Sequence, residues 1–160
     1  MKKLEDIKNL LKNVDCVIHC ASVGRHEGET NGVNVLYPEI EGMMNLLDVC
    51  EKSNIHRFIL IGSISNVLAG KYRKIYNESH WSYPDNCDIY ERAKFFVEKC
   101  AWNYYDNNKK SFKLTVFLPG LLLGPLLKKG EQSSNAVFFK KVLKKKLEKV
   151  VNLKIPVVDV

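Results

Sequence analysis

Short apolar runs alternate with longer segments of helical periodicity along the 160 residues of this chain. The helical segments cover residues 3–13, 38–53 and 90–107, and Pro38 suits the first turn of the second one. Between and after them lie three apolar runs, CVIHCAS (16–22), RFILIGSIS (57–65) and FKLTVFLP (112–119). Apolar strands separated by helices are typical of a parallel sheet that is covered on both faces. The sequence therefore predicts an α/β fold with a doubly wound parallel sheet.

The connecting segments are expected to be loops. Polar or glycine-containing stretches cover residues 25–32, 69–86 and 120–134. A lysine-rich helix is expected after residue 134, and the final IPVVDV (155–160) can start another strand.

The net charge of +7 is concentrated in the lysine-rich segment FFKKVLKKKLEKVVNLK (138–154). Such a run can attract nucleic acid or an anionic membrane surface. It also fits a helix with a solvated lysine face, because apolar residues recur at helical spacing through the same segment: Val137, Phe138, Val142, Leu143 and Leu147. No aromatic and basic residues interleave as in a nucleic-acid module. We favour the solvated helix and expect no nucleic-acid partner and no membrane partner.

Several features favour a cytoplasmic protein. No apolar run approaches the roughly 18 residues that a membrane span needs. The opening MKKLEDIKNLLKNVD mixes acidic residues into a helical pattern, unlike a signal peptide. Five cysteines form no disulfide framework, and no residues have the spacing of a metal site, so we expect no metal.

Small residues follow each predicted strand, in HCAS, GSIS and LPG. In parallel sheets ligands bind at the carboxyl ends of the strands, where small side chains let a ligand approach the backbone. Tyr90 and Lys94 are spaced by one turn of a predicted helix, about 5–6 Å apart at Cβ. A lysine ammonium beside a phenol lowers the tyrosine pKa, and such a tyrosine can exchange a proton with a substrate oxygen. Ser63 can donate a hydrogen bond to the same oxygen, an arrangement suited to carbonyl reduction by a nicotinamide.

Four blocks of the sequence occur in the order found in a known family. They are NVDCVIHCAS (13–22), the segment from PEIEGMM to ILIGSIS (38–65), YNESHWSYPDNCDIYERAK (76–94) and LPGLLLGP (118–125). Together they resemble the extended short-chain dehydrogenase/reductases of the NAD-dependent epimerase/dehydratase type, and within them the dihydroflavonol reductase-like branch. A single Tyr-x-x-x-Lys arises readily by chance, whereas four blocks in family order are specific.

The resemblance implies a catalytic role for three residues. Tyr90 would be the general acid, Lys94 would lower its pKa and bind the nicotinamide ribose, and Ser63 would orient the carbonyl. The family often has a serine where this chain has Gly62, and Ser65 is a weaker stand-in for Ser63. Ala93 replaces the family's usual serine and leaves the Tyr90–Lys94 pair intact.

The resemblance also implies cofactor contacts, and it lacks the family's first, glycine-rich segment. Ala21 and Ser22 would lie beside the adenosine half of NADP or NAD, and Pro119 and Gly120 would border the nicotinamide. The family opens with Gly-x-x-Gly-x-x-Gly, whose amides receive the pyrophosphate, and no such motif occurs in this sequence. We therefore expect residues 1–160 to form a single partial NAD(P)-binding Rossmann-like domain, the second half of a doubly wound sheet.

Three functional hypotheses follow. The first is an NAD(P)-dependent oxidoreductase, a dihydroflavonol reductase-like carbonyl reductase or alcohol dehydrogenase with a Ser-Tyr-Lys site, a small-molecule carbonyl or alcohol substrate and a possible homodimer. The second is a truncated, non-catalytic Rossmann-like fragment or pseudoenzyme that acts as an interaction module. The third, a basic nucleic-acid-binding domain, rests only on the lysine run. Neither the substrate nor the choice between NAD and NADP follows from these residues.

Overall fold

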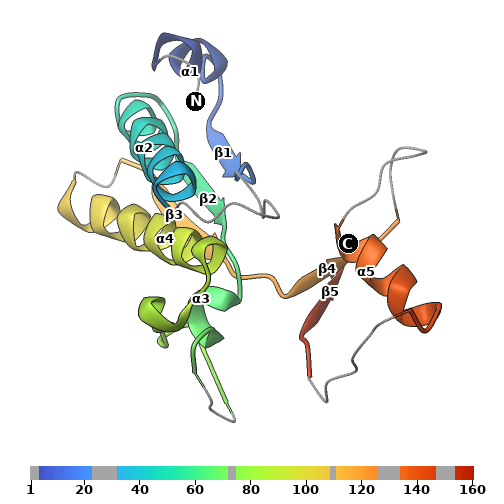
Figure 1. Cartoon of the computed structure of the whole chain (residues 1–160). Coiled ribbons are helices and arrows are strands. Elements are labelled where there is room, and N and C mark those ends of the chain that lie inside the picture. Colours follow the sequence, from blue (N-terminus) through green and yellow to red (C-terminus); the bar gives the residue numbers. More distant parts are fainter. Residues whose placement is uncertain (1–3, 23–31, 72–74, 109–110, 126–133, 147–153) are drawn as a thin grey trace. The chain divides into compact units, whose positions relative to one another are not determined.

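The structure, a computed structural model, describes residues 4–22, 32–71, 75–108, 111–125, 134–146 and 154–160. The chain forms two compact units, Met1–Leu118 and Pro119–Val160. Figure 1 draws the elements of both.

A three-stranded parallel sheet organises the first unit. Its strands β1 (Cys16–His19), β2 (Arg57–Ile61) and β3 (Lys113–Phe117) lie in the order β1-β2-β3. The register aligns Val17 with Phe58 and Phe58 with Leu114. The predicted α/β fold with a parallel sheet is therefore confirmed.

Two long helices make the crossovers between these strands. Helix α2 (Gly32–Glu51) connects β1 to β2, and helix α4 (Ile89–Asn107) precedes β3. Right-handed crossovers that move in one direction across a sheet place their helices on the same face. Figure 1 shows α2 and α4 side by side over the sheet, and the two helices pack directly on each other.

The core lies between these helices and the sheet. Its buried side chains come from α2, α4, β2, β3 and the residues that precede these strands, and they include Met43, Leu47, Phe58, Val97, Ala101 and Phe112. On the opposite face of the sheet side chains are more exposed, since Ile18 is 61% and Phe117 55% exposed, against 0% for Phe58. The sequence predicted a sheet covered on both faces. Helices α2 and α4 cover the face that carries Phe58 and leave the opposite face more exposed.

Shorter elements complete the first unit. Helix α1 (Leu4–Leu10) precedes β1 and contacts α2. The single-turn helix α3 (Ser65–Leu68) follows β2, and a 3-10 turn, η1 (Pro84–Asn86), leads into α4. The strand predicted to reach residue 65 thus ends at Ile61, and its last residue begins α3.

The predicted start of α2 at residue 38 is wrong. The helix begins at Gly32, so Pro38 lies in its interior, where it removes one backbone donor. The helix starts upstream because Val35 belongs to the same buried stripe as Met43 and Leu47, with 5% of its surface exposed. Of the loop predicted over residues 25–32, residues 25–31 lie outside the described part of the chain.

The second unit contains a β-α-β crossover. Strands β4 (Leu121–Leu123) and β5 (Val157–Asp159) pair in parallel, and helix α5 (Ser134–Leu143) lies between them in sequence. Asn135 Nδ2 donates to the carbonyl oxygen of Leu122 over 3.0 Å. The strand in IPVVDV is confirmed, and the lysine-rich helix is confirmed as far as Leu143, with residues 147–153 outside the described part of the chain. The loop predicted over 120–134 contains β4, and its residues 126–133 also lie outside the described part. Exposed lysines, Lys140 and Lys141, occupy the last turn of α5.

Within the described ranges, no helix has both the length and the apolar character needed to cross a bilayer.

A Leu47→Ala substitution tests this description of the core. Leu47 is fully buried, so its truncation should lower the free energy of unfolding by about 2–5 kcal/mol. Leu10→Ala is the matched control, because Leu10 is 63% exposed and the same truncation there should cost less than about 0.5 kcal/mol. Urea denaturation followed by circular dichroism measures both, and equal costs would contradict the burial of Leu47.

Candidate functional site

A tight turn after β2 carries Ser63. The Gly62 amide donates to the carbonyl oxygen of Phe117 over 2.8 Å, which extends the pairing of β2 with β3. A Cβ at residue 62 would lie 2.9 Å from Leu118 Cδ2 and 3.4 Å from the Phe117 oxygen. The nearest atom is the end of the Leu118 side chain, which can shift, so the structure does not require glycine where the resembled family often has serine.

The two serines of this turn are not equivalent. Ser65 is only 9% exposed, whereas Ser63 is partly exposed. Ser63 Oγ accepts hydrogen bonds from the Ser65 amide (3.2 Å) and from Ser65 Oγ (2.8 Å). Ser63 therefore presents the more accessible hydroxyl, and Ser65 lies behind it.

A capping box fixes the start of α4. Asp88 Oδ1 accepts from the Glu91 amide over 2.8 Å, and Glu91 Oε2 accepts from the Asp88 amide over 3.0 Å. Arg92 Nε also donates to the carbonyl oxygen of Pro84 over 2.7 Å. These contacts place Tyr90 in the first helical turn, near the positive end of the helix dipole.

Tyr90 and Lys94 lie one turn apart on α4, as their spacing predicts. Lys94 Nζ is 5.7 Å from the centroid of the Tyr90 ring. Lys94 is 8% exposed, which is unusual for a lysine. Burial lowers the pKa of the Lys94 ammonium, and the Glu39 carboxylate opposes this shift. The arrangement holds a partly desolvated cation beside a phenol.

Glu39 is the main site residue that sequence reasoning missed. It lies on α2 with 9% of its surface exposed, and its Oε1 accepts a 2.5 Å hydrogen bond from Ser22 Oγ. Burial lowers the pKa of His19 at the end of β1, Glu39 raises it and Lys94 lowers it further. The carboxylate thus acts on groups from two other elements. A usable signal was present, because Glu39 interrupts the apolar stripe formed by Val35, Met43 and Leu47.

A second polar contact joins the serine turn to α4. Asn66 is completely buried, and its Nδ2 donates to the Lys94 carbonyl oxygen (3.2 Å) and to Glu98 Oε2 (2.6 Å). Glu98 is also buried, and its Oε1 accepts from Trp102 Nε1 over 3.2 Å. Asn66 therefore ties the segment after Ser63 to the backbone of Lys94.

The loop before α4 packs on the same two elements. The Ser82 amide donates to the Asn66 carbonyl oxygen over 2.7 Å. Trp81 packs edge-on against Phe95, with ring centroids 5.7 Å apart, and Lys99 Nζ lies 3.5 Å from the Trp81 ring centroid. Trp81 thus anchors the loop to α4.

The residues expected to contact a cofactor fall in both units. Ala21 and Ser22 are exposed just after β1 in the first unit. Pro119 and Gly120 begin the second unit, before β4. A Cβ on Gly120 would collide with the carbonyl oxygen of Pro156, so the pairing of β4 with β5 already explains this glycine.

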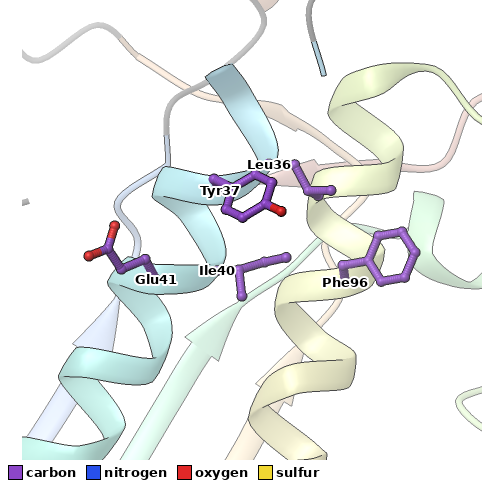
Figure 2. Close-up of a pocket in the computed structure, with 5 residues that line it drawn as sticks. All are labelled: Leu36, Tyr37, Ile40, Glu41 and Phe96. Atoms are coloured by element: carbon purple, nitrogen blue, oxygen red, sulfur yellow. The ribbon is translucent and has the colours of Figure 1, made fainter. Parts of the chain in front are cut away.

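An apolar groove of about 410 Å³ lies between α2 and α4 (Figure 2). Leu36, Tyr37, Ile40 and Glu41 line it from α2, and Phe96 lines it from α4. Tyr37 is 67% and Phe96 36% exposed. The groove therefore leaves large apolar side chains in contact with solvent.

Tyr90 and Lys94 of α4 have the chemistry for one end of a nicotinamide cofactor. The Lys94 amine and the Tyr90 hydroxyl can hydrogen-bond a ribose. Ala21 and Ser22 are small and exposed, so another part of a cofactor can approach them closely. The sequence contains no glycine-rich turn of the family type for the pyrophosphate. Tyr90 and Lys94 therefore fit a nicotinamide ribose. Among the described residues, no three His, Cys, Asp or Glu side chains gather as a metal site.

The model of the NAD dependent epimerase/dehydratase family matches residues 1–158. The chain is 28% identical over 120 residues to a bifunctional dihydroflavonol 4-reductase/flavanone 4-reductase of Malus domestica, covering 69% of this chain and 34% of that protein. It is 33% identical over 130 residues to tetraketide alpha-pyrone reductase 2 of Arabidopsis thaliana, covering 73% and 39%. The chain thus spans about a third of the length of the curated relatives it matches.

Solved structures show the same fold. Yeast methylglyoxal/isovaleraldehyde reductase, complexed with NADPH, superimposes with a TM-score of 0.80 at 22% identity, covering 98% of this chain and 53% of that one. A UDP-glucuronic acid 4-epimerase from Bacillus cereus, in complex with UDP-glucuronic acid and NAD, gives 0.68 at 19% identity, covering 89% and 44%. The Rossmann-like fold and the family resemblance predicted from the sequence are confirmed.

An Asn66→Asp substitution tests the link between the serine turn and α4. It preserves shape, removes both donors and sets a carboxylate against buried Glu98, so we expect a loss of about 3 kcal/mol in the free energy of unfolding. Adding Glu98→Gln should recover much of this loss, because the new amide can donate to Asp at residue 66. Urea denaturation of the single and double variants measures the coupling. Asn54→Ala, at an exposed position, is the control, and a double variant no more stable than Asn66→Asp would argue against the contact.

Proposed function

The chain belongs to the NAD-dependent epimerase/dehydratase family, and from this membership we propose that the protein is an NAD(P)-dependent oxidoreductase that reduces a carbonyl at Ser63, Tyr90 and Lys94. The observation that carries the proposal is the buried Lys94 amine, held 5.7 Å from the Tyr90 ring. The similarity to curated reductases supports the same reaction class.

In the proposed reaction these residues handle the proton and the developing charge. The bound nicotinamide supplies the hydride that reaches the carbonyl carbon. The Tyr90 hydroxyl donates its proton to the carbonyl oxygen, which becomes the alcohol, and the Lys94 ammonium stabilises the phenolate that remains. Ser63 donates a hydrogen bond to the same oxygen and so orients it.

Cofactor contacts are proposed for the residues named from the resemblance. Tyr90 and Lys94 would hold the nicotinamide ribose of NADP or NAD, with Ala21 and Ser22 beside the adenosine half. Pro119 and Gly120 would border the nicotinamide. The substrate is proposed to be a small-molecule carbonyl or alcohol. The five free cysteines support a reducing, cytoplasmic setting for this reaction.

We also propose that two copies pair through the groove between α2 and α4. Large apolar side chains exposed along one face of two adjacent helices commonly mark a protein interface. Here Val33, Tyr37 and Met44 of α2 and Phe96 of α4 are exposed, and the α2–α4 groove offers a complementary hollow. The same patch on each copy would meet across a two-fold axis.

Tyr90→Phe tests the proposed general acid. Removing the phenolic hydroxyl should lower kcat for carbonyl reduction by about 10²–10⁴-fold, because no other group replaces the proton donor. Oxidation of NADPH in the presence of a panel of ketones and aldehydes measures the rate. Tyr105→Phe, on the same helix and packed against Trp102 and Phe112, should retain activity.

A cofactor titration is the control for this experiment. NADPH or NAD should raise the Tm of the wild-type protein and of Tyr90→Phe, and Lys94→Met should weaken that rise. If millimolar cofactor leaves the wild-type Tm unchanged, the oxidoreductase proposal fails and the non-catalytic hypothesis takes its place.

Phe96→Glu tests the proposed pairing. A buried, unpaired charge in the α2–α4 groove should convert dimers to monomers in sedimentation-velocity experiments. Ile75→Glu, at a loop position that is 82% exposed, should leave the dimer intact. A wild-type protein that is monomeric at tens of micromolar would contradict the pairing.

A further inference from the structure

The hydroxyls of Ser63 and Ser65, in the turn after β2, are hydrogen-bonded to each other. Ser63 Oγ accepts the Ser65 amide over 3.2 Å and meets Ser65 Oγ at 2.8 Å. Both distances suit hydrogen bonds, the second close to the usual value between hydroxyls. The amide can only donate, so it occupies one lone pair of the Ser63 oxygen whichever way the hydroxyls point.

Burial decides which hydroxyl donates to the other. If Ser63 donated to Ser65, the Ser65 proton would need another acceptor, yet Ser65 is 9% exposed and Ser63 Oγ is the partner found for its hydroxyl within the described residues. A buried hydroxyl proton without an acceptor costs about 1–3 kcal/mol. The reverse direction satisfies the Ser65 proton and leaves the Ser63 proton free, at the more accessible residue. Donation from Ser65 to Ser63 is therefore favoured.

The backbone holds this arrangement in place. The Asn66 amide donates to the Ser63 carbonyl oxygen and the Ala69 amide to the Ser65 carbonyl oxygen, each over 3.0 Å. Asn66 in turn is bound to α4 through Lys94 and Glu98. The relative position of the two hydroxyls is thus set by the turn and not by free rotation of long side chains.

We propose that Ser65 is a positioning residue, whose hydroxyl and amide occupy both lone pairs of Ser63 Oγ and thereby direct the Ser63 proton to the substrate oxygen. This inference rests on the proposed oxidoreductase function. A donor that itself accepts two hydrogen bonds is also polarised into a stronger donor. Ser65 thus acts through Ser63 and does not replace it.

Ser65→Ala tests the proposal in the 160-residue chain. Removing an oxyanion donor itself costs about 10²–10³-fold in kcat, so loss of the group behind it should cost less, about tenfold, with KM unchanged. Ser65→Thr retains the hydroxyl and should restore most of the rate. Ser53→Ala, which removes a serine hydroxyl that donates to the Val49 carbonyl oxygen at the end of α2, should keep the wild-type rate.

The double variant separates positioning from a merely structural role. In a Ser63→Ala background, Ser65→Ala should lower kcat no further, because the group it orients is gone. An equal tenfold loss in both backgrounds would overturn the proposal, and so would full activity of Ser65→Ala.

A measurement independent of turnover distinguishes this proposal from the proposed function. In urea denaturation, the losses from Ser63→Ala and Ser65→Ala should be non-additive, because each breaks the same hydrogen bond. Additive losses would overturn the hydroxyl pair even in an active protein. A wild-type protein that binds no cofactor and reduces no carbonyl would overturn the catalytic role together with the proposed function.

Discussion

The burial of the Lys94 amine is the constraint on which the rest of this site depends. A lysine with 8% of its surface exposed is costly unless nearby groups compensate for lost hydration. The packing of α4 on α2 and the sheet keeps Lys94 buried. Helix α2 also supplies the Glu39 carboxylate, which opposes the lowering of the Lys94 pKa. The carboxylate is in turn bound by Ser22 from the end of β1. Helices α2 and α4 and the end of β1, which lie far apart in the sequence, therefore together form the surroundings of the Lys94 ammonium.

Much of the fold could be predicted because its signals are local. The apolar runs at β1, β2 and β3 and the periodicity of α4 need no knowledge of distant residues. The start of α2 could not be predicted in this way, because proline's preference for a first turn is outweighed by the burial of Val35. Strand β4 was predicted as a loop. Its three leucines, residues 121–123, form a strand only by pairing with residues 157–159, more than thirty positions away.

In the candidate site too, local features could be predicted from the sequence and contacts between distant residues could not. The spacing of Tyr90 and Lys94 follows from one helix and was predictable, whereas Asn66 bridges 28 and 32 residues to reach Lys94 and Glu98. No pattern in the serine segment indicates that its asparagine is fully buried. Glu39 was readable in principle, as a charge on an apolar stripe, but its role depends on which elements meet that stripe. Tertiary contacts such as those of Asn66 and Glu39 determine which groups surround Tyr90 and Lys94.

The capping box at Asp88 and Glu91 has a kinetic meaning beyond fixing where α4 begins. Helix ends fray, and Tyr90 lies in the first turn, so an opened end would carry the phenol away from the chemistry proposed for it. The observed rate would then scale with the fraction of molecules whose first turn is formed. A cap worth about 1 kcal/mol changes the ratio of closed to open ends roughly fivefold. The capping box can thus set the share of molecules that are competent at any instant.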